Sequence, residues 1–160
     1  MSENKAYDLT GKWQLSFTAG THSITGDLTG PLGATPATKW IGTFARDPSV
    51  ELPPDPPNGY RARFLGTFAT TRGQQVIPAE VFTGMRFLTT VSPEPLPLTV
   101  VHFYQADGGV SDGIPYYSTW SGALIWDWTD PAHPRDTKLF VGYYADLMKD
   151  WGRFELKKVG

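Results

Sequence analysis

The residue best suited to chemistry in this chain is His102, which lies in an apolar run from Val100 to Tyr104. An imidazole titrates near neutral pH and can therefore act as a general acid or base. Tyr104 follows two residues later, so in an extended strand its side chain lies on the same face as His102. These two residues are the predicted catalytic pair if the protein is an enzyme. The other interpretation is that His102 is a hydrogen-bonded core residue.

Aromatic side chains are the second chemical feature of the chain. Its 160 residues include 9 Phe, 7 Tyr and 6 Trp, and they are densest between Tyr116 and Trp128. Tyr and Trp combine a large apolar body with one hydrogen-bonding group, and such residues line pockets for flat or apolar ligands. They also stack on sugar rings, or they simply fill a core. The surplus of rings predicts a ligand cavity or an interface.

Other kinds of site have little support in the sequence. There is no Cys, and His22, His102 and His133 are far apart, so no metal motif is present and no cofactor is expected. The run from Gly109 to Gly113 matches the Gly-x-Ser-x-Gly pattern of hydrolases. That pattern requires a helix after the serine, whereas a β-rich stretch follows here, so we interpret the run as a turn.

Charge and hydropathy limit the partners. Lys plus Arg number 14 and Asp plus Glu number 16, a net charge of −2 that argues against nucleic acid. No apolar run is long enough to span a membrane, and the first residues lack the apolar core of a secretory signal. We therefore expect a cytoplasmic protein, although a mature secreted form would look the same. A homo-oligomer is left open.

The elements that must position these residues are predicted to be strands. The 17 Gly and 14 Pro interrupt every stretch that a long helix would need, and apolar residues recur at every second position. We expect an all-β fold, a single antiparallel up-and-down β-barrel of about eight strands, with at most one short helix, starting at Pro78. Residues 1–160 form one domain, with a flexible lead over 1–8 and a Pro-rich loop over 47–59.

Alternation within the strands selects the residues that would face the interior. Trp40, Gly42 and Phe44 share one face, and the sequence around Gly66 repeats this arrangement 24 residues later. A Gly between two rings leaves space for a bulky neighbour or a bend. The predicted lining of the barrel is Trp40, Phe44, Phe68, His102, Tyr104, Tyr116, Trp120 and Leu124.

Several short stretches resemble the calycin barrels, which include lipocalins and avidins. Gly11-Lys12-Trp13 is similar to their Gly-x-Trp opening, in which the Trp closes one barrel end. Ile41 to Phe44 and Leu65 to Phe68 resemble the Gly-Thr-aromatic strands of avidins, and Ser118 to Gly122 resembles their Thr-Trp-Ser-Gly strand. Gly152 to Leu156 resembles the last strand of lipocalin-like domains. The resemblance implies a calycin-like barrel and a pocket role for Trp120.

Three functions are therefore predicted from the sequence. The first is binding of one small, largely apolar or aromatic molecule inside the barrel. The second is a cofactor-independent enzyme, such as a cyclase, isomerase or dehydratase, that uses His102 on such a molecule. The third is a carbohydrate-binding module that uses Trp126 and Trp128 on the surface.

Overall fold

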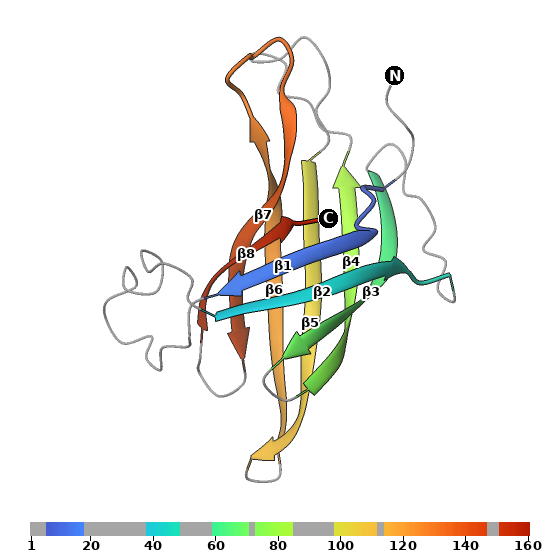
Figure 1. Cartoon of the computed structure of the whole chain (residues 1–160), viewed down its shortest axis with the longest axis vertical. Coiled ribbons are helices and arrows are strands. Elements are labelled where there is room, and N and C mark those ends of the chain that lie inside the picture. Colours follow the sequence, from blue (N-terminus) through green and yellow to red (C-terminus); the bar gives the residue numbers. More distant parts are fainter. Residues whose placement is uncertain are drawn as a thin grey trace.

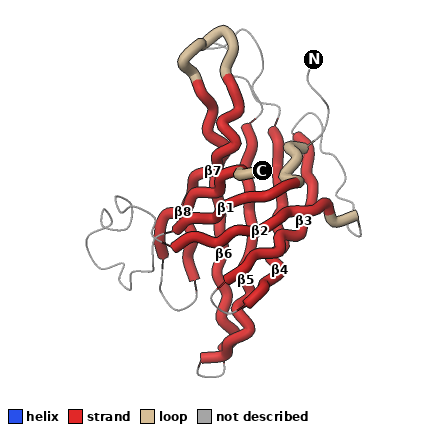
Figure 2. Tube along the Cα trace, in the orientation of Figure 1, coloured by secondary structure: helices blue, strands red, loops and turns tan. Residues whose placement is uncertain are grey.

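The protein is a closed barrel of eight strands, in which each strand pairs antiparallel with the next and β1 pairs with β8 (Figures 1 and 2). This computed structural model describes residues 6–17, 38–48, 59–70, 73–84, 98–111, 114–146 and 151–160. The strands are β1 (Gly11–Phe17), β2 (Thr38–Arg46), β3 (Gly59–Thr70), β4 (Gly73–Gly84), β5 (Leu98–Ser111), β6 (Ile114–Asp127), β7 (Arg135–Asp146) and β8 (Trp151–Lys158). The described residues contain no helix, and the predicted all-β up-and-down barrel is confirmed.

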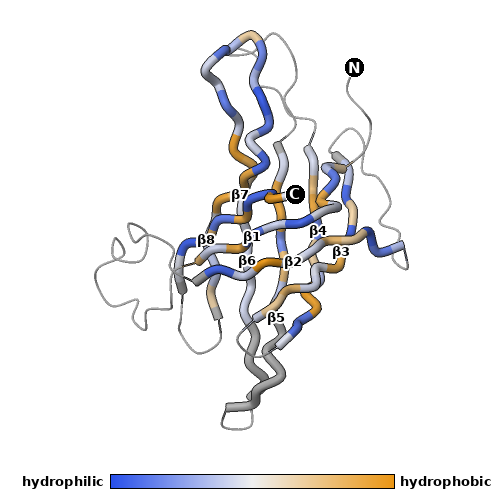
Figure 3. Tube along the Cα trace, in the orientation of Figure 1, coloured by the Kyte–Doolittle hydropathy of each residue, from blue (hydrophilic) through white to orange (hydrophobic). Residues whose placement is uncertain are grey.

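The core lies inside the barrel and takes alternate residues from every strand. Trp13 and Leu15 point inward from β1, Phe154 and Leu156 from β8, and all four are completely buried. The residues between them are polar, which gives the alternation of orange and blue along the strands in Figure 3. Because closure leaves no free sheet edge, every strand has hydrogen-bonded neighbours on both sides.

Glycines on the inner face make room for these rings. A Cβ added to Gly42 would lie 2.5 Å from the ring of Phe68, and one on Gly66 would lie 2.6 Å from the ring of Phe44. Gly122 is covered in the same way by Phe154, at 2.8 Å. The space beside each glycine therefore holds a neighbouring ring.

The segment after Pro78 is part of β4 and does not start a helix. Pro78 pairs with Leu65 of β3, whereas the pairing of β4 with β5 extends only to Ala79. Proline has no N–H to donate, and it lies at the point where pairing on the β5 side ends. The alternation from Ile77 to Thr83, buried at every second residue, is that of a strand with one face in the core.

Residues 6–10 pack against one end of the barrel. The backbone N–H of Tyr7 donates to Oγ1 of Thr83 at 2.8 Å, and its hydroxyl donates to Asp136 at 2.8 Å. Leu9 is completely buried, and its carbonyl accepts the indole N–H of Trp13 at 2.7 Å. Of the flexible lead predicted over 1–8, residues 1–5 lie outside the described residues, and Tyr7 is bonded to Thr83 of β4 and Asp136 of β7. Of the predicted Pro-rich loop, residues 49–58 lie outside the described residues.

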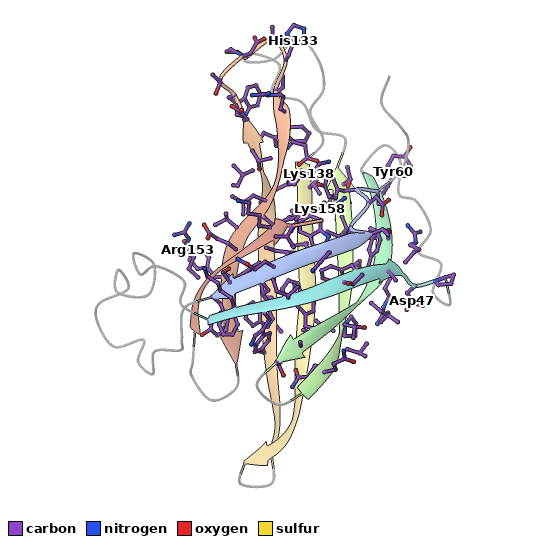
Figure 4. The ribbon with its side chains drawn as sticks, viewed as in Figure 1. Asp47, Tyr60, His133, Lys138, Arg153 and Lys158 are labelled. Atoms are coloured by element: carbon purple, nitrogen blue, oxygen red, sulfur yellow. The ribbon has the colours of Figure 1, made fainter. Side chains whose placement is uncertain are left out.

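The hairpin of β6 and β7 extends beyond the barrel, with His133 at its tip (Figures 1 and 4). Asp127 accepts hydrogen bonds from Thr129 at 2.6 Å and from Arg135 at 3.0 Å, which closes the turn. At the base of the hairpin Lys138 has a φ of 57°, and its ammonium group lies 2.8 Å from Asp136. The same ammonium group lies over the ring of Tyr7, 5.6 Å from its centroid, and so links the hairpin to the N-terminal segment.

Candidate ligand-binding site

The rings in one part of the barrel interior form a continuous set that we call the aromatic cluster. Its members come from six of the eight strands and are Phe17, Trp40, Phe103, Trp120, Tyr144 and Phe154. Four of them are buried, whereas Phe17 and Trp40 keep partial exposure. The cluster therefore reaches from the core to the surface through these two side chains.

Trp120 is the centre of the aromatic cluster. Its indole is stacked between Tyr144, with centroids 4.5 Å apart, and Phe103, with centroids 5.4 Å apart. This arrangement follows from the register, because Trp120 is directly opposite Phe103 on β5 and Tyr144 on β7. Its N–H donates to Oγ of Ser118 at 3.0 Å. With both faces covered and its only donor used, Trp120 serves mainly to pack the core.

Trp40 differs from Trp120 in its hydrogen bonding. Its ring lies edge-on to that of Phe17, with centroids 4.8 Å apart, and its Nε1 is buried. No residue among those described accepts the proton of Nε1. A buried N–H without an acceptor costs about 1 to 3 kcal/mol. The aromatic cluster therefore presents one hydrogen-bond donor without an acceptor among the described residues, and this donor belongs to Trp40, one of its two partly exposed rings.

A second buried polar group has no partner within the described part of the chain. Oγ1 of Thr99 is buried at the start of β5, and Thr99 is opposite Thr83 on β4. Thr83 accepts the N–H of Tyr7, so this pair lies at the barrel end that the N-terminal segment covers. We therefore do not assign Thr99 to the aromatic cluster.

The structure brings together only some of the residues predicted to line the barrel. Phe44 and Phe68 are buried and in contact, with centroids 5.4 Å apart, and Leu124 is also buried on the inner face of β6. Trp40 and Trp120 are joined through Phe17, which contacts both. The side chain of Tyr116 lies outside the described residues.

The predicted inward placement of His102 and Tyr104 is wrong. Both lie on the outer face of the barrel, with their rings 5.2 Å apart, and Tyr104 is 49% exposed. Val101 and Phe103, at 0% and 1% exposure, are the residues that face inward from β5. The strand has apolar residues on both faces, so alternation alone did not show which face is buried. His102 therefore cannot act on a molecule held inside the barrel.

Four members of the aromatic cluster were absent from the predicted lining: Phe17, Phe103, Tyr144 and Phe154. A usable signal existed for Tyr144. Phe140, Gly142 and Tyr144 repeat the ring-Gly-ring spacing that selected Trp40, Gly42 and Phe44, and all three residues are buried. For Phe154 the sequence gives only the second half of this spacing, a Gly at position 152 followed two residues later by the ring.

The chemistry available in the aromatic cluster is stacking and hydrogen bonding. Its members carry no charge, and the polar atoms are the two indole N–H groups and the hydroxyl of Tyr144. Among the described residues, the titratable group with the largest pKa shift is Tyr7, at the other end of the barrel. Burial and the neighbouring Asp136 raise the pKa of Tyr7 far above its ordinary value and keep it protonated.

The described residues contain no group of three or more side chains suited to hold a metal ion. None of them forms a helix long and apolar enough to cross a membrane. Comparisons of the chain with protein-family models, with curated proteins and with solved structures gave no match.

Proposed function

We propose that this barrel binds one small, largely apolar or aromatic molecule that carries a hydrogen-bond acceptor. The molecule packs at the surface-reaching part of the aromatic cluster, against Phe17 and Trp40, and its acceptor takes the N–H of Trp40. The observation that carries the proposal is the buried Nε1 of Trp40, which has no acceptor among the described residues. A carbonyl, ether or phenolic oxygen on a ligand would satisfy it.

The position of the ligand follows from the packing of the rings. Trp120 is stacked on both faces, so a ligand has no free face of this residue to use. Phe17 and Trp40 are the members that keep exposure, and they meet edge to face. A flat molecule can therefore contact these two rings without displacing the buried ones. The expected contact is at the mouth of the barrel, not at its centre.

We also propose that the barrel is calycin-like. The support is the Gly-x-Trp sequence of β1, in which Gly11 has a φ of 127° and Trp13 is fully buried beside the segment that covers one barrel end. The opposite end is where the aromatic cluster reaches the surface through Phe17, the last residue of β1. A barrel of this kind with one covered end suits a ligand that enters from the other.

The test uses pairs of probes that differ only in the acceptor, namely aryl ketones and the alkylbenzenes of the same shape. Tryptophan fluorescence and melting temperature report binding to the wild type, to Trp40→Phe and to the control Trp126→Phe. We expect the wild type and the control to favour the ketone by about 10-fold, the value of one hydrogen bond. Trp40→Phe should bind both probes equally. The proposal fails if no probe binds, or if Trp40→Phe keeps the preference.

The two other functions predicted from the sequence receive no support from the geometry. The enzyme required His102 inside the barrel, and it lies outside. The carbohydrate module required Trp126 and Trp128 on the surface. Both are half-buried, and Trp126 packs against the core. Binding through the aromatic cluster is therefore the function that we propose.

A further inference from the structure

The outer face of β5, β6 and β7 carries two exposed aromatic rings. Tyr104 on β5 is 49% exposed and Tyr143 on β7 is 51% exposed, and β6 runs between them. With their direct cross-strand neighbours they form two rows, which we call the tyrosine platform: Tyr104, Thr119 and Ala145; His102, Ser121 and Tyr143. All six side chains point away from the core, because Phe103, Trp120 and Tyr144 are inward residues of the same strands.

Small hydroxyl residues separate the two tyrosine rings. Thr119 and Ser121 are both exposed, and their short side chains leave the larger rings standing above the strand between them. Two strand spacings of about 4.8 Å and one row of about 6.8 Å place the Cα atoms of Tyr104 and Tyr143 about 12 Å apart. The ring of His102 lies at 89° to that of Tyr104, with centroids 5.2 Å apart, and this contact limits how Tyr104 can turn.

We propose that the tyrosine platform binds a neutral oligosaccharide whose sugar rings carry equatorial hydroxyl groups. Such a sugar ring presents slightly positive C–H groups on its faces, and these suit the negative face of an aromatic ring. The hydroxyl groups of Thr119 and Ser121 and the imidazole of His102 can exchange hydrogen bonds with sugar hydroxyls. The separation of the two tyrosines exceeds the length of one sugar ring, so only a chain of several sugars contacts both.

The open shape of the tyrosine platform favours a saccharide over an apolar molecule. The outer face of a sheet covers only one side of a ligand, so a purely apolar molecule would leave its other side in water and gain little from burial. The hydroxyl groups of a saccharide remain hydrated on the uncovered side. The residues of this site also differ from those of the sugar site predicted at Trp126 and Trp128.

The charges around the tyrosine platform favour a neutral ligand. None of its six members is Asp, Glu, Lys or Arg. Glu80 is opposite His102 on β4, and Arg153 is opposite Tyr143 on β8, so the two ends carry opposite signs. The carboxylate of Glu80 lies 3.7 Å from an arginine, and the guanidinium of Arg153 lies 3.0 Å from a glutamate. Single-stranded nucleic acid also stacks on exposed rings, but it requires a positively charged groove for its backbone.

The size of the tyrosine platform favours a small ligand over a protein partner. Three strands about 4.8 Å apart and two rows about 6.8 Å apart give a footprint of about 200 Å². Stable protein interfaces bury roughly 800 Å² on each partner. A short oligosaccharide fits the smaller area. Because only one side of it is covered, we expect a dissociation constant of about 1 mM.

The first test compares ligands of two lengths. Cellobiose and cellotetraose, which are β-1,4-linked glucose oligomers, are titrated to about 10 mM while the backbone amide signals of the full chain are followed by NMR. Cellotetraose should shift signals on β5, β6 and β7, and it should bind about 2- to 10-fold more tightly than cellobiose, the value of one further ring contact. No binding of cellotetraose, shifts confined to other strands, or equal affinity for the two ligands would each overturn the proposal.

The second test removes the rings one at a time. Tyr104→Ala and Tyr143→Ala should each weaken cellotetraose binding by about 2- to 10-fold and abolish its advantage over cellobiose. Tyr104→Phe and Tyr143→Phe keep the ring and should keep most of the affinity. The control Val76→Ala removes a 62% exposed apolar side chain on β4 outside the platform and should bind like the wild type. Circular dichroism verifies that each variant is folded.

Two results of the second test would refute stacking on the platform. One is wild-type affinity in both alanine variants, and the other is an equal loss in the phenylalanine and alanine variants. The proposal does not rest on the aromatic cluster. Aryl ketones should bind Tyr104→Ala as tightly as the wild type, so each proposal can fail alone.

Discussion

Replacement of Trp40 and of Trp120 by Phe makes the same chemical change at two places in one cluster, and the structure predicts different costs. Each substitution removes the outer ring of the indole and its N–H. At position 120 the N–H is hydrogen-bonded to Ser118 at 3.0 Å. At position 40 the buried N–H has no acceptor within the described residues. The first change therefore breaks an interaction, whereas the second removes an unfavourable buried donor.

The magnitude follows from these two terms. Loss of a neutral hydrogen bond costs about 0.5 to 1.5 kcal/mol, and removal of an unsatisfied buried donor restores about 1 to 3 kcal/mol. The loss of packing is larger at position 120, because Trp120 is 2% exposed and stacked on both faces, whereas Trp40 is partly exposed. Trp120→Phe should therefore destabilise the fold by about 1.5 to 4.5 kcal/mol more than Trp40→Phe.

The assay is urea unfolding at equilibrium, followed by circular dichroism so that the missing indole does not change the signal of interest. A difference of this size also separates the two melting temperatures by about 3 to 18 °C in a domain of this length. Equal destabilisation by the two substitutions would refute the assignment of an unused donor at Trp40. A Trp40→Phe variant that is less stable than Trp120→Phe would show that the N–H of Trp40 has an acceptor in the free protein.

Three further predictions concern positions outside the aromatic cluster. Gly142→Ala should prevent or severely weaken folding, because its Cβ would collide with a backbone carbonyl of β6, and the soluble yield and melting temperature would show this. Tyr7→Phe should cost about 1 kcal/mol through the lost bond to Asp136. Because the folded pKa of Tyr7 lies above its ordinary value of 10.0, this contribution is complete below pH 10 and declines above it, so the stability difference between wild type and variant should shrink there. Hydrogen bonds from Thr129 hold the pKa of Asp127 below its ordinary value of 3.8, so its contribution is present above that pH and is lost as the pH falls further. An NMR titration of Asp127 with its midpoint at or above 3.8 would contradict the turn geometry.

The barrel could be predicted from the sequence because the signals that indicate it lie within short stretches of the chain. Strand alternation, the Gly and Pro that exclude helices, and the spacing of hairpins all act over a few residues. β1 and β8 show this well, since Trp13 and Leu15, like Phe154 and Leu156, are buried between polar neighbours. Where one face is apolar and the other polar, the sequence determines which face is inside.

The choice of face at β5 could not be predicted in this way. Val100 and Tyr104 on one face are matched in size by Val101 and Phe103 on the other, so the alternation of large side chains alone selects neither face. The register with β6 decides the question, because Phe103 is directly opposite Trp120 and so must share its inward face. That pairing joins two different strands, so the alternation within β5 does not contain it and does not show that His102 lies outside.

The glycines change how the abundance of aromatic residues should be interpreted. In isolation, 22 rings in 160 residues and glycines between them suggest a hollow interior. In the structure Phe68, Phe44 and Phe154 cover Gly42, Gly66 and Gly122, so each glycine serves the packing of a neighbouring ring. Among the described residues nine of these rings are buried in the core, and the packing of those nine gives no independent support for a ligand. The case for binding depends instead on one atom, the buried Nε1 of Trp40, whose bonding the core leaves incomplete.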